Sequence, residues 1–103
     1  MLFHVIATHT AENCPGYDLK KMGPQTLAAA EKMNETAKQL KVKVHFILSA
    51  APEHTMYALL EADSLVAVSD FLIAMPFRQD FKVTPVVHIK DTLKSLKARM
   101  AKK

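Results

Sequence analysis

Residues 42–61 read VKVHFILSAAPEHTMYALLE, and this stretch decides the fold. Apolar and polar residues alternate over 42–49, which is the pattern of a strand with one buried face. A short connection at 50–53 contains Pro52, and the alternation resumes over 54–61. Two strands joined this closely predict an antiparallel hairpin in the middle of the chain.

A predicted helix flanks the hairpin on each side. Pro24 stands at a favourable first helical position, and apolar residues then recur at helical spacing until the helix ends near Lys41. These apolar positions are Leu27, Ala30, Met33, Ala37 and Leu40. The second predicted helix covers residues 63–75, with Asp63 as its N-terminal cap and Pro76 as its stop.

The outer strands are predicted at 2–9 and 81–89, because both segments alternate. The element order is therefore β-α-β-β-α-β, which with short connections predicts a ferredoxin-like α+β fold. Its four-stranded antiparallel sheet has the spatial order 4-1-3-2 and is backed by two helices. A single domain, residues 1–103, ends in an extra basic C-terminal helix at 91–103. That helix is expected to dock on the domain through Leu93, Leu96 and Met100.

Strand parity divides the predicted sheet into two faces. The more apolar rows should face the helices, and they are Phe3, Val5 and Ala7; Val44, Phe46 and Leu48; Met56, Ala58 and Leu60; and Val83, Val87 and Ile89. The opposite rows are His4, Ile6 and Thr8; His45, Ile47 and Ser49; Thr55, Tyr57, Leu59 and Glu61; and Thr84, Val86 and His88. This open face is half apolar, so we expect it to meet a second copy in a homodimer. Asp in place of Ile47 or Val86 should disrupt that dimer.

The element order, the length near 100 residues and the half-apolar open face resemble the dimeric α+β barrel superfamily. That group includes muconolactone isomerase-like proteins, cofactor-free monooxygenases of antibiotic biosynthesis, stress-responsive barrel proteins and haem-degrading enzymes. The resemblance covers residues 1–90 and rests on pattern, so it transfers no catalytic residue. It implies a pocket for a small, often aromatic or haem-like ligand, either between sheet and helices or inside the dimeric barrel.

Composition and charge narrow the function classes. The single cysteine, Cys14, cannot form an internal disulfide, and no apolar run approaches the roughly 20 residues of a membrane span. With no recognisable secretion leader, we expect a cytoplasmic protein that does not bind membranes. The net charge of +4 is concentrated in residues 90–103, where basic side chains far outnumber the one acidic side chain, Asp91. A basic tail without aromatic partners makes nucleic acid an unlikely ligand.

The first candidate site combines His4, His88 and Glu61. His4 opens its strand and the other two close the antiparallel neighbours, so all three are predicted on the open face at one end of the sheet. Two imidazoles and a carboxylate can bind iron or another divalent metal, or act as an acid–base set. His45 starts the second strand at the same end. The alternative is a polar rim whose side chains bond to one another or to water.

The second candidate site combines His9, Cys14 and His54. His9 ends the first strand and His54 begins the third, so both are predicted at the opposite end of the sheet, where the loop after His9 can fold Cys14 over them. Cysteine with two histidines can hold copper or zinc, and a histidine beside a cysteine can activate a thiolate. Glu12 is a candidate fourth ligand. The alternative is that Cys14 is a small apolar filler.

Tyr57 and His45 are the candidate ligand-binding residues of the open face. The preferred interpretation is a dimeric barrel that binds a small ligand or a transition metal, as a monooxygenase-like oxidoreductase or an isomerase that uses pocket histidines. Iron, copper, zinc and haem all remain candidate cofactors. The alternative is a non-catalytic structural or regulatory homodimer with incidental histidines. The chain has no phosphate-binding glycine loop and no G-x-S-x-G or H-E-x-x-H motif.

Overall fold

A computed structural model describes residues 1–76 and 78–102 of the protein. Its strands are β1 (Leu2–Thr8), β2 (Lys43–Ala50), β3 (Thr55–Glu61) and β4 (Asp80–Val86). Its α-helices are α1 (Gly23–Glu31), α2 (Met33–Leu40), α3 (Leu65–Ile73) and α4 (Ile89–Ala101). Short 3₁₀ turns lie at Ala11–Asn13, Pro15–Tyr17 and Ala51–Glu53. Lys103, the last residue of the predicted basic helix, lies outside the described residues.

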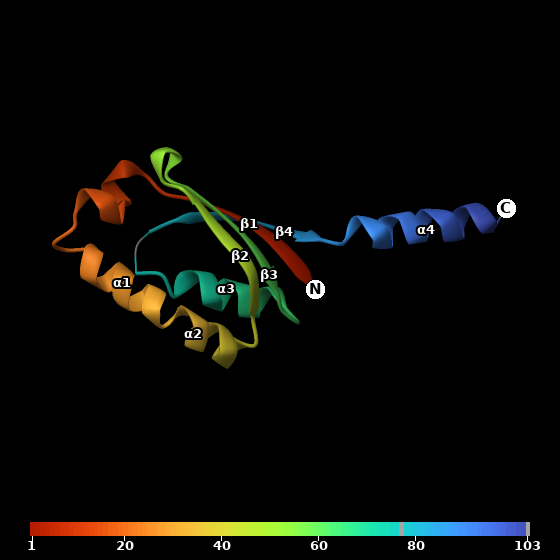
Figure 1. The fold of residues 1–103 in the computed structure, drawn as a ribbon, viewed down its shortest axis with the longest axis horizontal. Coiled ribbons are helices and arrows are strands. Elements are labelled where there is room, and N and C mark those ends of the chain that lie inside the picture. Colours follow the sequence, from red (N-terminus) through yellow and green to blue (C-terminus); the bar gives the residue numbers. More distant parts are fainter. Residues whose placement is uncertain (77, 103) are drawn as a thin grey trace.

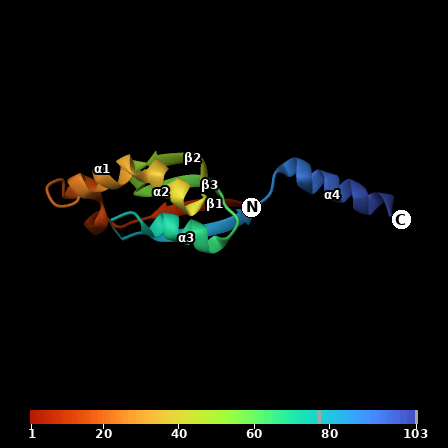
Figure 2. The same cartoon turned by 90° about the horizontal axis from the view of Figure 1, so that it is seen from below.

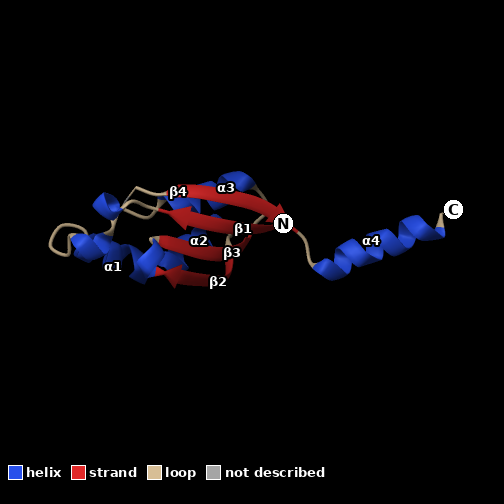
Figure 3. Ribbon diagram, turned by 90° about the horizontal axis from the view of Figure 1, so that it is seen from above, coloured by secondary structure: helices blue, strands red, loops and turns tan. Residues whose placement is uncertain are grey.

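The four strands form one antiparallel sheet in the order β2-β3-β1-β4, which confirms the predicted topology (Figure 3). β1 is central, and its Leu2 lies opposite Glu61 of β3 and Val86 of β4. The backbone N–H of Ala62 donates to the Met1 carbonyl at 3.0 Å, which continues the central pairing by one step. The fold is therefore α+β and ferredoxin-like, as the sequence predicts.

The helices α1, α2 and α3 cover one face of the sheet and leave the other face open (Figures 1 and 2). The core lies between these two layers, and its largest fully buried side chains are Phe3, Val5, Leu60 and Val68. Burying each such side chain stabilises the fold by roughly 1.5–3 kcal/mol. The predicted helix-side rows of β1 and β3 are confirmed, because their buried residues alternate with more exposed ones.

The predicted faces of β2 are wrong beyond its second residue. Val44 lies opposite Leu60, yet Phe46, two positions later, lies opposite Leu59. β2 therefore advances by two residues where β3 advances by one, and His45 is the extra residue of a β-bulge. A one-residue slip sends every following side chain to the other face of the sheet.

The bulge changes which side chains each face carries. Ile47 lies opposite Ala58 and packs against the core, although parity alone predicted it on the open face. Phe46 and Leu48 stand on the open face instead, where they are 38% and 59% exposed. The open face is consequently more apolar than the sequence predicted, but Ile47 does not belong to it.

Two helix predictions also need correction. The single helix predicted before the hairpin is divided into α1 and α2, with Lys32 between them. The cap of α3 is Ser64 rather than Asp63, because the Ser64 hydroxyl accepts a hydrogen bond from the backbone N–H of Ala67 at 3.2 Å. The helix begins at Leu65, so the cap and the first helical residue each lie one position later than predicted.

The C-terminal region departs most from the prediction. β4 ends at Val86, and α4 begins at Ile89 and projects away from the sheet (Figure 1). The predicted docking of this helix is wrong within the single chain, because its apolar residues are exposed, namely Leu93, Leu96 and Met100. The projection gives a Cα radius of gyration of 16.9 Å, whereas a compact domain of this length would have about 13 Å.

Candidate functional site

His9 and His54 face each other directly after the last regular pair of β1 and β3. The backbone N–H of His9 donates to the His54 carbonyl at 3.1 Å. Their rings meet edge to face, with centroids 5.2 Å apart and planes at 74°. His54 has the left-handed backbone conformation, with φ of 52°, at the end of the Ala51–Glu53 turn. The tight connection from β2 to β3 thus fixes the position of its imidazole.

Cys14 reaches the two histidines because the loop after β1 folds into two short 3₁₀ turns. It lies between the turns Ala11–Asn13 and Pro15–Tyr17. The Cys14 N–H donates to the Ala11 carbonyl at 3.2 Å, and the Cys14 carbonyl accepts from the Tyr17 N–H at 3.1 Å. The cysteine is therefore anchored from both sides by local backbone bonds.

The three side chains form one group at this end of the sheet. One ligand atom from each of His9, Cys14 and His54 lies within 4.8 Å of the other two, and all three residues are half-buried. Within residues 1–76 and 78–102, no other set of three His, Cys, Asp or Glu side chains is grouped in this way. The structure thus brings the second predicted cluster together, without Glu12 as a fourth member.

Burial affects the protonation of this group. Desolvation, and to a smaller extent the neighbouring His54 imidazole, lowers the pKa of His9 from its ordinary value of 6.5. His9 is therefore neutral at neutral pH, which is the form that binds a metal ion. The Nδ1 atom of His54 is buried without a hydrogen-bond partner among the described residues. A bound cation would compensate the cost of leaving that nitrogen unpaired.

The first predicted cluster is not assembled. The register of β1 places Leu59 and Thr84 opposite His4. His88 lies beyond the end of β4, as the N-terminal cap residue of α4. The prediction required β4 to continue as a strand through residue 89, and the earlier strand end removes His88 from the sheet.

Glu61 pairs with His45 rather than with His4. Its Oε1 atom lies 2.8 Å from Nε2 of His45, the bulged residue of β2. This hydrogen bond is the main reason that the pKa of Glu61 is lowered from its ordinary value of 4.5. Both side chains are well exposed to solvent, at 30% for His45 and 48% for Glu61. The pair therefore orients the bulge and contributes little to the stability of the fold.

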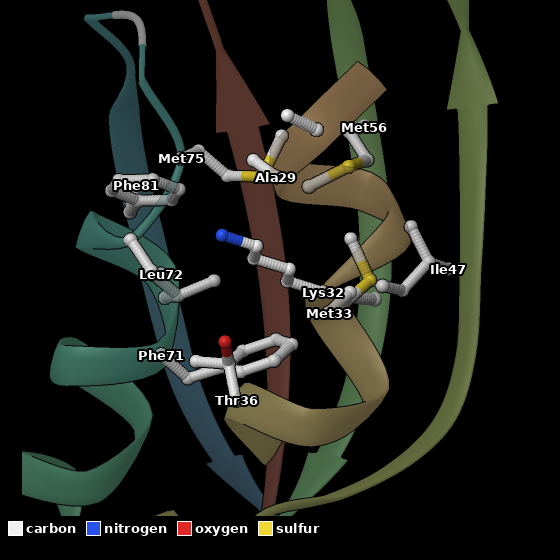
Figure 4. A pocket seen from close by; sticks show the side chains of 13 residues that line it. Ala29, Lys32, Met33, Thr36, Ile47, Met56, Phe71, Leu72, Met75 and Phe81 are labelled. Atoms are coloured by element: carbon white, nitrogen blue, oxygen red, sulfur yellow. The ribbon is translucent and has the colours of Figure 1, made fainter. Parts of the chain in front are cut away.

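A cavity of about 270 Å³ lies between the helices and the sheet (Figure 4). Its lining comes from α1 to α3, from β2 to β4 and from the residues that join them, and it comprises Ala28, Ala29, Lys32, Met33, Thr36, Ile47, Met56, Ala58, Phe71, Leu72, Ala74, Met75 and Phe81. None of the candidate ligand residues predicted from the sequence lines this cavity. The signal for the cavity in the sequence is the run of alanines on α1, where larger side chains would fill the space.

A second hollow, of about 170 Å³, adjoins the histidine–cysteine group through His9. The other residues around it are mostly polar, namely Thr8, Thr10, Asn13, Arg78, Gln79 and Asp80. Tyr57 and His45, the two predicted ligand-binding residues, line neither of these cavities. His45 is instead engaged by Glu61.

Comparison with protein families matches residues 1–100 to the family described as "Domain of unknown function (DUF3303)". Comparison with curated proteins finds no match. None of the helices in the described part of the chain is long and apolar enough to cross a lipid bilayer.

Proposed function

The chain belongs to the DUF3303 family, and we propose that it is a transition-metal-binding protein whose ion is held by His9, Cys14 and His54. The observation that carries this proposal is the convergence of three ligand atoms within 4.8 Å. They come from the end of β1, the following loop and the start of β3. His9 and Cys14 are close in the sequence, but His54 is far from both, so its convergence with them is a property of the fold.

The spacing suits a single ion. Ligand atoms bound to one tetrahedral zinc at about 2.0–2.3 Å lie roughly 3.5 Å from one another. Atoms within 4.8 Å therefore need only small side-chain rotations to share an ion. The chemistry of the donors is equally suitable, because two imidazoles and a thiolate are preferred by zinc and copper.

Three protein ligands leave one coordination position of a tetrahedral ion open. Sites that act on substrates keep such a position for water or substrate, whereas purely structural zinc sites fill all four. The polar hollow beside His9 would give a small molecule access to that position. On this basis we extend the proposal to an oxidoreductase or isomerase acting in the cytoplasm, where Cys14 stays reduced.

We also propose that the working form is a homodimer. In support, the open face of the sheet carries half-buried and exposed apolar side chains, with no cover from the chain's own helices; they include Ile6, Phe46, Leu48, Tyr57, Leu59 and Val86. An apolar face of this kind is typical of an interface with another chain. A structural or regulatory homodimer that binds no metal is the alternative function.

Metal analysis of protein purified without chelator tests the site. We expect close to one zinc or copper ion per chain, and reconstitution with Co²⁺ should give the absorption of a tetrahedral thiolate-ligated ion. The variants Cys14→Ser and His54→Gln should each bind at least about tenfold more weakly. His88→Gln is the matched control, because His88 lies outside the group, and it should bind as tightly as the unmodified protein.

Alkylation of Cys14 gives an independent measurement. Bound metal should protect the thiol, and chelation should make it reactive. Equal alkylation rates with and without chelator, together with no stoichiometric metal, would contradict the proposal and favour the structural or regulatory homodimer.

A further inference from the structure

The cavity between the sheet and the helices is largely apolar. Three of its walls carry methionines, Met33 on α2, Met56 on β3 and Met75 after α3. Methionine is flexible and polarizable, and it is common on surfaces that adapt to varied apolar ligands. The cavity therefore offers a deformable apolar lining to whatever enters it.

Lys32 is the charged member of this lining. It stands at the junction of α1 and α2, where the backbone N–H of Thr36 donates to its carbonyl at 2.9 Å. Its side chain extends from the helix junction along the cavity in the direction of α3 (Figure 4). Lysine stems usually lie along apolar surface so that the ammonium group ends in water. Lys32 follows this rule, because it is exposed: its stem contributes to the cavity lining while its ammonium group remains accessible to water.

No carboxylate balances this ammonium group. In the part of the chain that the structure describes, Lys32 makes no salt bridge, and the residues around the cavity include no aspartate or glutamate. Thr36, one helical turn further on, lies on the same side of the helix and adds a hydroxyl to the lining. A cation on the lining of a largely apolar cavity, with no carboxylate beside it in the lining, can receive a small anionic group.

We propose that this cavity binds a small amphipathic carboxylic acid, with its carboxylate against Lys32 and its apolar body among the methionines. A single ammonium group balances the one negative charge of a carboxylate, whereas a phosphate has a higher charge and would need more donors. The apolar body is retained by hydrophobic burial.

The cavity volume limits the size of the ligand. A volume of about 270 Å³ corresponds to roughly nine water-sized groups at about 30 Å³ each. This is the size of an eight-carbon fatty acid or an arylpropanoic acid. The inference does not depend on the metal site, since it uses none of the same residues, and either proposal can fail alone.

Binding of octanoate, measured by calorimetry and by NMR of the methionine methyl groups, tests the proposal. Octanoate should bind at one site per chain and shift the methyl signals of Met33, Met56 and Met75. Octanol, which has the same apolar body without the charge, should bind about tenfold more weakly or worse. Octylammonium should show no measurable binding, because its charge matches that of Lys32.

Three variants distinguish the contribution of the Lys32 charge to binding from the contribution of the cavity space. Lys32→Met should remove the preference for octanoate over octanol, whereas Lys38→Met, a change outside the cavity lining, should keep it. Ala29→Phe should fill the space and abolish binding of both ligands, with folding checked by circular dichroism. Equal affinity for octanoate and octanol, full octanoate affinity in Lys32→Met, or shifts confined to methionines outside the cavity would each overturn the proposal.

Discussion

Ile47 lies directly opposite Ala58 in the β2–β3 pair, so its side chain joins the face of the sheet that packs against the helices. Its neighbour Leu48 lies opposite Tyr57 on the open face. This arrangement results from the bulge at His45, and it makes two adjacent apolar residues experimentally distinguishable.

Truncation of these two residues should have unequal effects on stability. Ile47→Ala should lower the free energy of unfolding by about 1–3 kcal/mol, because it removes methylene groups from a half-buried position beside the core. Leu48→Ala should change it by no more than about 0.5 kcal/mol, measured where the protein is monomeric. Urea unfolding at low protein concentration checks this. The reverse order would show that β2 has no bulge.

The proposed dimer predicts that a charge at position 48 has a large effect on assembly. Leu48→Asp should convert the dimer to monomer, because the carboxylate would be buried without a partner in the interface. Lys38→Asp, which places the same charge on exposed α2, should leave the dimer intact. Sedimentation equilibrium at micromolar concentration measures both variants. If the unmodified protein sediments as a monomer, the proposed interface does not exist.

The cap of α3 provides a test of local structure. Ser64→Ala removes the hydroxyl that accepts from Ala67 and should cost about 1 kcal/mol of stability, seen as a lower thermal midpoint. Asp63→Ala is the control and should have a smaller effect, since Asp63 makes no capping bond in the structure. A larger loss of stability from Asp63→Ala than from Ser64→Ala would show that Asp63 is the capping residue, as the sequence predicted.

The pH dependence of stability should report on His9. Its pKa is lowered in the folded protein, so the unfolded chain takes up this proton first as the pH falls. Without metal, the free energy of unfolding should be steady above the ordinary value of 6.5 and decrease below it, by at most about 1.4 kcal/mol per pH unit for one proton. Glu61, whose pKa is also lowered, should add a further loss only as the pH falls below 4.5.

Urea titrations between pH 5 and 8 in the presence of chelator measure this decrease. His9→Gln should flatten the curve below the ordinary histidine value, and His88→Gln should not. A curve that is unchanged by His9→Gln would mean that His9 gains no proton preferentially on unfolding.

Much of the fold follows from the sequence, because hydrophobic periodicity is a local property. The strand order and the buried rows of β1 and β3 were predictable, since these strands are regular throughout. The bulge at His45 was not, because residues 46–48 are all apolar, so either register buries an apolar side chain and tertiary packing decides between them. Residue parity therefore failed beyond that point.

The two candidate sites differ in how they depended on these predictions. His9 and His54 lie at strand ends whose register was correct, and the cysteine loop needed only to fold back. His4 and His88 required β4 to extend past Pro85 to residue 89, but the strand stops at Val86. Proline supplies no ladder hydrogen bond, and a helix begins soon after it. The cavity beside Lys32 depends on the packing of three helices, which local periodicity does not determine.

The projecting helix α4 has a consequence for how the chain folds. It contains 13 residues and carries several basic side chains of like charge, while its apolar residues are exposed to solvent. An isolated helix of about this length is only marginally stable in water, because nucleation is costly and no tertiary packing compensates for it. The helical state of residues 89–101 should thus depend on association with another surface. Far-ultraviolet circular dichroism should then show helix content that rises with protein concentration, so that ordering of this segment and assembly form a single coupled equilibrium.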